Sequence, residues 1–510
     1  MNKYLIILSL SLLVTFQLNA QQLKGFCGTN DADQLIIKER MLENRRFFEK
    51  NALPRTGAKI WIPITYHLYA RTDGTGRLPA RYVFDNLCSI NLYFADQEIE
   101  FFIKEIRLTN NTDIYDDPSS TLGSARIKSV MNQGKSSVNV FVASKARGSD
   151  PNVLAFYNGQ DDYLVANKDY VNADGSILAH EIGHFLSLPH TFIGWETCQY
   201  KETDCPNPTP TLTCGGTLVE YVNRDKLHAN GQKHCELAAD GFCDTPADYN
   251  LGFGHGPQGD CTYNGCAKDP DGVPLNPDET IFMGYFIDCD DHFTQEQKDA
   301  MHRDYLSGSR AYLRIPVYNP KPLITESIIY IAPPKGSTHP GYDMVNLDWD
   351  PVANADNYLV EVATNIGFSL DLKWFFTKRT DTLITTLSPT KLYFWRVYAY
   401  NSNSFCKIPA FTNFRTPSFK VASTDLSLEG IQIYYQELQH KKIEMHITSD
   451  VSDKGSLVIY NLAGKKVAQR ELVLKPGKET VEFSVPNPGL YFYNINFQSN
   501  KKSSGKIIVQ

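Results

Sequence analysis

The sequence predicts a multidomain protein, in which an α/β domain with a mixed, twisted sheet and a metal-binding helix precedes two all-β sandwich modules. Three observations support this fold class. The length of 510 residues is typical of roughly three or four domains. Residues 58–315 mix alternating apolar segments with helical periodicity, whereas residues 318–417 and 427–510 hold alternating segments separated by turns. A histidine-rich motif near residue 180 has the spacing of metal ligands on a helix.

Residues 1–20 predict a secretory signal. Lys3 supplies the positive start, and Leu5 to Phe16 form an apolar stretch that is short for a membrane span. Cleavage is expected after Ala20, and an uncleaved anchor is the alternative. No other segment is long and apolar enough to cross a membrane, so we expect no transmembrane segment in the mature chain.

The α/β domain begins with a run of predicted strands and one long helix. Apolar alternation predicts strands at residues 60–69, 99–108, 137–144 and 153–166. The helix predicted at residues 80–96 has an inward face made of Val83, Leu87, Ile90, Leu92 and Phe94. A capping-box pattern at Thr294 and Gln297 opens a further helix. Residues 153–166 are the candidate edge strand, just before the metal-binding helix.

The segment His180-Glu181-Ile182-Gly183-His184-Phe185-Leu186-Ser187-Leu188-Pro189-His190 carries three imidazoles and one carboxylate at the spacing of a catalytic zinc site. His180 and His184 are four residues apart, so they share one face of a helix predicted from about residue 175 to residue 187. His190 joins them only if the helix ends near Ser187 and the chain turns back. Three protein ligands leave the fourth zinc position for water, as in a catalytic site. The alternative is an amphipathic helix whose histidines bind no metal.

Glu181 is the predicted general base. It lies beside the ligands, where it reaches a zinc-held water and not the metal itself. Zinc lowers the pKa of that water towards about 7, and the carboxylate can take its proton as the water attacks a carbonyl.

The motif resembles the metzincin pattern HExxHxxGxxH, which is followed by a methionine-containing turn beneath the zinc. Ile281-Phe282-Met283-Gly284-Tyr285 fits that turn. Further short motifs resemble those of one metzincin branch, the pappalysin family. They are Cys243-Asp244-Thr245-Pro246, Cys289 and Phe293-Thr294-Gln295-Glu296-Gln297. The resemblance covers roughly residues 25–315 and implies a zinc endopeptidase with protein or peptide substrates.

One position departs from the family pattern. Ser187 stands where the family has Gly, which lets the chain leave the helix through a left-handed backbone conformation. Ser can adopt that conformation at a cost of about 1 kcal/mol. The departure therefore puts the placement of His190 in question without abolishing the site.

Residues 21–57 are polar and charged and look like a short pro-segment, with an exposed cleavage site near Arg55. Pappalysin-like proteins often carry a Cys-Gly-Thr near the start, which matches Cys27-Gly28-Thr29. The resemblance implies a latency switch, in which the Cys27 thiolate occupies the open zinc position before activation. The alternatives are a disulfide partner for Cys27 or no role.

The resemblance also implies roles for residues near the methionine turn. Tyr285 occupies the position of a tyrosine that stabilises the tetrahedral intermediate in several metzincins, although a buried structural tyrosine is the alternative. Met283 has no chemical part and would pack below the ligands. Asp288 would select Arg or Lys after the cut, or is a solvated carboxylate. The edge strand at residues 153–166 would pair with extended peptide.

Eleven cysteines indicate an oxidising compartment, where disulfides persist. Eight of them follow the zinc motif within a loop-rich stretch: Cys198, Cys205, Cys214, Cys235, Cys243, Cys261, Cys266 and Cys289. Disulfides are expected to join these loops, in a connectivity that the sequence does not define. The pappalysin family commonly binds calcium here, and Asp240, Asp244 and Thr245 offer hard oxygen ligands, with surface solvation as the alternative.

Two β-rich modules follow. Residues 318–417 resemble a fibronectin type III module, with Trp and Tyr side chains expected in its core. Residues 427–510, with a hairpin at residues 457–465, resemble the C-terminal sorting domain of type IX secretion substrates. This resemblance implies export by the secretion machinery, followed by removal of the domain or attachment at the surface; another small sandwich is the alternative.

Together these features predict a secreted or surface-attached zinc endopeptidase, with zinc and calcium as cofactors. A net charge of −7 and a pI near 6.0 give no reason to expect a nucleic-acid partner. The alternative is a surface adhesin or binding protein with a non-productive metzincin-like domain. Glu181 and Tyr285 favour the enzyme, whereas the departure from the family pattern at Ser187 is the one feature that favours the adhesin. The methionine turn and the edge strand disfavour a non-peptidase zinc hydrolase.

Overall fold

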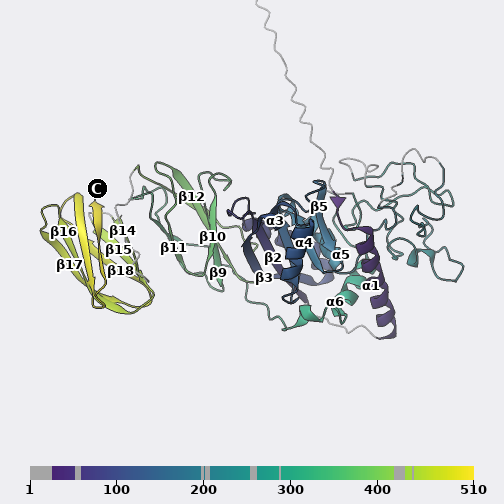
Figure 1. The fold of residues 1–510 in the computed structure, drawn as a ribbon, viewed down its shortest axis with the longest axis horizontal. Helices are drawn as coiled ribbons and strands as arrows, with labels where there is room; N and C mark the ends of the chain where they lie inside the picture. The colour runs from purple at the N-terminus through teal and green to yellow at the C-terminus, as the bar shows by residue number, and fades with distance from the viewer. Residues whose placement is uncertain are drawn as a thin grey trace, which may run out of the picture. The chain divides into compact units, whose positions relative to one another are not determined.

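The computed structural model describes residues 26–51, 59–196, 200, 207–252, 261–286, 289–339, 341–418, 431–438 and 442–509. The chain forms two compact units, shown with the labelled elements in Figure 1. The first unit holds residues 1–78, 89–100 and 105–315, and the second holds residues 79–88, 101–104 and 316–510. Within the described residues, no helix combines the length and apolar character needed to span a bilayer. The predicted signal and the cleavage site near Arg55 lie outside these residues.

A mixed six-stranded sheet forms the centre of the first unit, in the order β1-β5-β6-β4-β2-β3. Strands β2, β4 and β6 run parallel, and β5 runs antiparallel to β6. The α/β fold class predicted from the sequence is therefore confirmed. The strands are β1 Phe26–Cys27, β2 Ile60–Ala70, β3 Ile99–Asn110, β4 Val138–Ala143, β5 Val153–Asn158 and β6 Tyr163–Asn167.

The candidate edge strand is two strands and not one. Residues 153–167 fold back as a β5–β6 hairpin, because Asp162 adopts a left-handed backbone with φ 66° and the chain reverses after Asn158. Strand β1 pairs in parallel with β5, with Cys27 opposite Ala155. The predicted pro-segment therefore occupies the free edge of this hairpin by strand addition.

The helices of this part of the chain are α2 Arg81–Tyr93, α3 Thr112–Asp116, α4 Thr121–Met131, α5 Ser176–Phe185 and α6 Gln295–Leu306. Helices α2, α5 and α6 were predicted from the sequence, whereas α3 and α4 were not. The capping box of α6 is present as the sequence indicated. One expectation for α2 was wrong: Leu92 is 76% exposed. The residues at spacings of three and four (Val83, Leu87, Ile90 and Phe94) are buried, and Leu92 points away from that face.

The predicted pro-segment, residues 21–57, contains a helix that the sequence analysis did not predict. Helix α1 spans Asp31–Lys50, and the Asn30 side chain caps it by accepting a hydrogen bond from the Asp33 backbone. Its buried face is narrow and includes Gln34, Ile37 and Met41. The helix was missed because most of its side chains are charged or polar. Helices α1 and α6 are in contact and lie side by side in Figure 1.

The second unit contains a seven-stranded sandwich with sheets β10-β9-β12-β13 and β11-β8-β7. Trp349 and Trp395 are almost fully buried, with ring centroids 6.3 Å apart, which confirms that these aromatic side chains form core and not surface. The strands are β7 Tyr330–Ala332, β8 Val345–Trp349, β9 Asn357–Ala363, β10 Lys373–Thr377, β11 Asp381–Ile384, β12 Leu392–Tyr400 and β13 Phe411–Arg415.

The start of α2 belongs to this same unit. A disulfide joins Cys88 to Cys406 across a sequence separation of 318. The fully buried Glu361 carboxylate binds both Arg81 and Arg396, so its charge is paired on two sides. Three rings pack around Phe84, from Tyr398, Tyr400 and Phe405.

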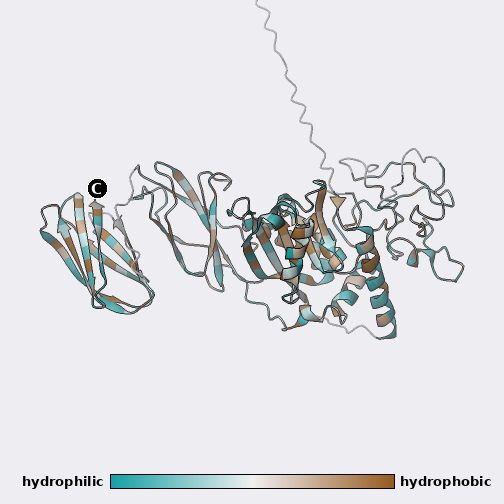
Figure 2. Cartoon of the chain, in the orientation of Figure 1, coloured by the Kyte–Doolittle hydropathy of each residue, from teal (hydrophilic) through white to brown (hydrophobic). Residues whose placement is uncertain are grey.

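A second sandwich ends the chain, with sheets β14-β15-β18 and β17-β16-β19-β20. Teal and brown residues alternate along its strands in Figure 2, as expected for strands with one buried face. The predicted hairpin at residues 457–465 is the turn between β16 and β17. The strands are β14 Ile431–Leu438, β15 Lys442–Ser449, β16 Asp453–Asn461, β17 Lys466–Leu474, β18 Gly477–Ser484, β19 Gly489–Phe497 and β20 Lys502–Val509.

The chain between α5 and α6 is largely irregular in its described parts. Disulfides Cys235–Cys243 and Cys261–Cys289 join its loops, which bears out the prediction that disulfides stabilise this stretch. Cys27 is the free cysteine of the described residues, and it is buried.

Candidate metal centre and active site

Helix α5 carries His180 and His184 on one buried face. Gly183 lies between them and lets the helix approach the methionine turn, because a Cβ at this position would meet the Met283 sulfur at 2.5 Å. Met283 is fully buried. The structure thus places Met283 directly against the helix that carries two of the three predicted ligands.

The chain turns back at the end of α5 through a left-handed residue. Ser187 has φ 70°, and Leu188 N donates to the Gly183 carbonyl at 2.9 Å, while Ser187 N donates to the His184 carbonyl at 3.0 Å. This pair of bonds is a Schellman motif, which usually has Gly at the left-handed position. The departure from Gly therefore keeps the expected backbone, and His190 reaches the other two imidazoles.

The Ser187 hydroxyl gains contacts that a Gly would lack. It donates to Asp304 at 2.6 Å and accepts from the Arg40 guanidinium at 2.7 Å. Both contacts are wholly or partly buried, where hydrogen bonds to charged groups each contribute about 1.5–3 kcal/mol. These bonds offset the strain of the left-handed serine.

We expect Ser187→Ala to destabilise the full-length protein more than Ser187→Gly, by about 1 kcal/mol, because both lose the hydroxyl but only Ala keeps the strained Cβ. Urea unfolding of both variants, with the wild type as reference, measures the difference. Equal stabilities, or a less stable glycine variant, would show that backbone strain at this position is negligible.

The imidazoles of His180, His184 and His190 converge on one point. The His190 Nε2 atom lies 3.3 Å from that of His180 and 3.2 Å from that of His184. The Cys27 sulfur lies 3.5 Å from His184 Nε2, and the four ligand atoms all lie within 4.8 Å of one another. Three nitrogens and one sulfur are the donor set that tetrahedral zinc prefers, so the residues present fit this metal.

The protonation of the histidines also suits a metal. Burial lowers the pKa of His180 to about 4, and lowers the pKa values of His184 and His190 well below the ordinary range. The rings are therefore neutral near pH 7. The Nδ1 atoms of His180 and His184 donate to the carbonyls of Phe282 and Leu188, at 2.5 and 2.7 Å, which leaves each Nε2 lone pair free for a ligand bond.

Glu181 is fully buried beside the histidines. Burial raises the pKa of its carboxyl to about 8, partly offset by hydrogen bonds from Cys27 and Thr29. The Thr29 hydroxyl donates to Oε2 at 3.3 Å, whereas Oε1 has no hydrogen-bond partner among the described residues. The Glu181 carboxyl, the predicted general base, therefore lies beside the three predicted zinc ligands, with one oxygen available to a water molecule.

The tripeptide Cys27-Gly28-Thr29 contacts both the histidines and Glu181. Cys27 faces His184, and Thr29 faces Glu181. Gly28 lies between them because a Cβ there would meet a Val153 methyl group at 2.4 Å. Strand β1 thus brings a sulfur to the metal ligands and a hydroxyl to the base at the same time.

Tyr285 contacts both the histidine cluster and strand β1. Its ring centroid is 4.9 Å from that of His190, and its hydroxyl donates to the Cys27 carbonyl at 2.8 Å. The predicted intermediate-binding hydroxyl is therefore engaged by the pro-segment. Gln34 of α1 also reaches the centre, where its Oε1 accepts from the His190 backbone at 3.0 Å.

A pocket opens beside the cluster. Asp288, the predicted specificity residue, lies outside the described residues, whereas Asp290 contributes to the pocket wall. The lining residues are Cys27, Ile177, His180, Glu181, Gly284, Tyr285 and Asp290.

The predicted calcium ligands are only partly together. The Thr245 hydroxyl donates to Asp240 at 3.3 Å, and burial, with the Glu220 charge second, raises the pKa of Asp240. Asp244 instead accepts hydrogen bonds at the start of α6, from the Thr294 hydroxyl and the Glu296 backbone at 2.8 and 2.7 Å. Within the described residues, the histidine–cysteine cluster is the one group of three or more metal-binding side chains.

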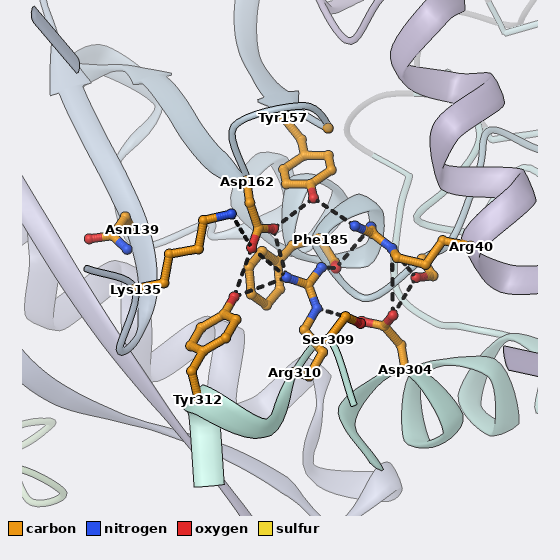
Figure 3. Close-up of polar contacts among 12 residues, drawn as sticks. Arg40, Lys135, Asn139, Tyr157, Asp162, Phe185, Asp304, Ser309, Arg310 and Tyr312 are labelled. Atoms are coloured by element: carbon orange, nitrogen blue, oxygen red, sulfur yellow. Dashed lines mark hydrogen bonds and ion pairs between the residues drawn. The ribbon is translucent and has the colours of Figure 1, made fainter. Parts of the chain in front are cut away.

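A buried ionic network supports the end of α5, as Figure 3 shows. Arg310 is 2% exposed and binds Asp162 at 2.6 Å and Asp304 at 2.8 Å, while another of its nitrogens donates to the Phe185 carbonyl. Arg40 of α1 adds a bond to the Tyr157 hydroxyl at 3.1 Å. The carbonyls that end the metal-binding helix are therefore held by guanidinium groups, one of which comes from the pro-segment.

Sequence reasoning missed several residues of this centre, namely Gln34, Arg40, Glu196 and Arg310. Glu196 could have been identified from the sequence, because it is a single acidic residue in the largely apolar stretch after His190. The other three come from α1 and from the segment after α6, and nothing in the local sequence relates them to the histidines.

Comparisons with known proteins agree with this geometry. The peptidase family model described as pregnancy-associated plasma protein-A matches residues 132–234. The model of the secretion system C-terminal sorting domain matches residues 439–510. No curated protein matches the chain.

Similar solved structures were also found. A mutant of promirolysin from Tannerella forsythia is 16% identical, covering 57% of this chain and 97% of its own, with a TM-score of 0.34. The fibronectin type III domain of human collagen alpha-1(XX) is 22% identical, covering 21% of this chain and 93% of its own, with a TM-score of 0.15. A two-domain fibronectin type III segment from chicken tenascin is 15% identical, covering 36% and 98%, with a TM-score of 0.14. These scores are too low to support an assignment by themselves.

The zinc motif and the peptidase family match define the class: the chain is a metzincin-type zinc metalloendopeptidase. Residues 132–234 match the pappalysin family model, and zinc is the metal that this class of enzyme implies. The sorting domain at its C-terminus marks it for export, so the protein is secreted or attached to the cell surface.

Proposed function

We propose that the chain is the zymogen of a secreted zinc endopeptidase that hydrolyses extended peptides with Glu181 as general base. The observation that carries this proposal is the convergence of three neutral imidazoles beside a buried carboxylate, at a sheet edge that already holds a peptide strand. No structural observation favours the adhesin, since Ser187 is accommodated by its hydroxyl contacts.

His180, His184 and His190 would hold the zinc. When bound, zinc supplies a Lewis acid that polarises the scissile carbonyl and makes water acidic. Glu181 would take a proton from the attacking water and return it to the leaving amine. Once the pro-segment has left, the Tyr285 hydroxyl loses the Cys27 carbonyl and can donate to the developing oxyanion. The free edge of β5 would align the substrate by main-chain hydrogen bonds.

The pro-segment, residues 21–57, would keep the enzyme latent with Cys27 as the fourth ligand. Burial, and secondly the Glu181 charge, raise the pKa of the Cys27 thiol. A bound zinc ion opposes that rise, because a coordinating thiol is deprotonated. Cleavage near Arg55 would release β1 and α1 together.

We also propose a preference for Arg or Lys after the cut. Asp288 remains the candidate from sequence, and Asp290 in the pocket wall supports an acidic subsite. Burial raises the pKa of Tyr93, and carboxylates at Asp174, Asp290 and Asp291 add to the rise, so negative charges gather around this tyrosine. A basic side chain would gain charge-assisted bonds here.

Calcium binding near Asp240 and Thr245 is a further part of the proposal. The Asp240 Oδ2 atom is buried with no hydrogen-bond partner among the described residues, and a divalent cation would satisfy it. The contacts of Asp244 at the start of α6 make it a weaker candidate.

The domain boundaries are proposed as predicted: a signal at 1–20, the pro-segment at 21–57, the protease at 58–315, a fibronectin type III-like module at 318–417 and the sorting domain at 427–510. The sorting domain would engage the secretion machinery, and it is either removed or used for attachment.

A peptide-library digest by the activated protein tests the proposal. We expect cleavage that stops with a zinc chelator and returns on adding zinc, with Arg or Lys enriched after the cut. Asp288→Ala and Asp290→Ala identify which carboxylate contributes to selection. Zinc binding without cleavage of any peptide would contradict the endopeptidase, whereas cleavage without basic enrichment would contradict only the preference.

A further inference from the structure

The three imidazoles of the metal centre differ in the hydrogen-bond partner of Nδ1, the ring nitrogen that faces away from the metal. His180 and His184 each donate from Nδ1 to a backbone carbonyl. His190 is fully buried, yet its Nδ1 has no hydrogen-bond partner among the described residues. A ligating histidine almost always donates its other N–H to a carboxylate, a carbonyl or water. The third ligand therefore lacks the support that the first two have.

A carboxylate faces this nitrogen. Glu196 Oε1 lies 3.6 Å from His190 Nδ1, and it too is buried without a hydrogen-bond partner among the described residues. The other oxygen, Oε2, accepts from the Gly194 backbone at 2.7 Å and so fixes the carboxylate in place. A donor and an acceptor, each buried and unsatisfied, are thus separated by slightly more than a hydrogen bond.

The loop from His190 to Glu196 contains two turns that keep the two side chains close together. Ile193 N donates to the His190 carbonyl at 3.3 Å, and Trp195 N donates to the Phe192 carbonyl at 2.9 Å, so the chain turns twice within six residues. Gly194 permits the turn, because it has φ 95° and a Cβ there would meet the Thr217 hydroxyl at 2.2 Å. Glu196 is therefore returned towards the ring that begins the loop.

We propose that Glu196 is a positioning residue for the metal, whose Oε1 accepts a hydrogen bond from Nδ1–H of His190 when zinc is bound. The bond fixes the tautomer that presents Nε2 to the metal and increases the basicity of the ligand. His190 needs this support more than the other two ligands, because it lies on a loop beyond the left-handed Ser187 and not on α5. The inference depends on the zinc site proposed above.

The test is zinc affinity of the full-length zymogen, measured by competition with a chromogenic chelator. Glu196→Ala should weaken zinc binding about 10- to 100-fold, and the isosteric Glu196→Gln should weaken it less, because its amide oxygen still accepts a neutral hydrogen bond. Glu236→Gln, the same substitution in the same loop region with no contact to a ligand, is the matched control. Cobalt substitution adds a spectroscopic readout, since a shifted absorption band reports altered ligand geometry at position 190.

The outcomes separate the two proposals. If the wild type binds no zinc, the proposed enzyme fails. If the wild type binds zinc and all three variants bind it equally well with unchanged cobalt spectra, the Glu196 inference alone is overturned. Weaker zinc binding by Glu196→Gln, with an unchanged melting temperature of the metal-free protein, would support a positioning role over a merely structural one.

Discussion

Replacing Glu181 with Gln is expected to lower kcat for peptide hydrolysis by the activated enzyme about 100- to 10,000-fold, the range of general-base catalysis. The amide keeps the shape of the side chain but cannot take a proton from water. The histidines converge without any contribution from Glu181, so the zinc content should not change.

The same substitution should not destabilise the zymogen. Glu181 is fully buried, burial raises its pKa to about 8, and one of its oxygens has no partner among the described residues. With a pKa of about 8 the carboxyl is mostly neutral near pH 7, so a neutral amide of the same shape adds no buried charge. Loss of activity together with an unchanged or higher melting temperature would therefore separate catalysis from folding.

Two controls define this experiment. His184→Ala should lose both zinc and activity, and Glu236→Gln should lose neither. A Glu181→Gln enzyme with full zinc content and wild-type kcat would show that another group is the base.

Replacing Cys27 with Ala should raise the activity of the unprocessed protein by about tenfold or more, since loss of a stabilising contact of about 1.4 kcal/mol shifts the open population tenfold. The sulfur is the group of the pro-segment that reaches the imidazole nitrogens from β1. Initial rates on a small fluorogenic peptide, with the cleavage site near Arg55 blocked by mutation, measure this directly.

Thr29→Val is the matched control for the thiol. It removes the hydroxyl contacts to Glu181 and to the Tyr157 backbone, and it leaves the sulfur, the β1–β5 register and Gly28 in place. If the thiolate is the switch, Cys27→Ala should activate the zymogen far more than Thr29→Val does. Unchanged latency in Cys27→Ala would mean that strand β1 blocks the cleft by occupancy alone.

The sequence predicted the parts of this molecule that are set by local spacing. The i, i+4 histidines, the capping box of α6, the alternating strands and the two sandwiches follow from periodicity within a short segment. The position of His190 also followed, because the motif needs a helix that ends near Ser187, and α5 ends at Phe185.

The features that were missed depend on distant partners. Only a narrow face of helix α1 is buried, and its polar side chains Gln34 and Arg40 find partners more than a hundred residues away. The hairpin within residues 153–166 was read as one strand because both of its arms are apolar and buried, which hides the turn at Asp162. Arg310 acts through contacts with Asp162 and the Phe185 carbonyl that no sequence period encodes, whereas Glu196 contacts a residue only six positions away and could have been found.

The disulfide between Cys88 and Cys406 has a consequence for biogenesis. During synthesis and export, Cys88 emerges 318 residues before its partner, so the link cannot close until nearly the whole polypeptide has been made. At typical elongation rates of about 5–20 residues per second, this delay lasts roughly 15–60 seconds. Completion of the second unit is therefore a late event, which needs the oxidising conditions that an exported chain meets.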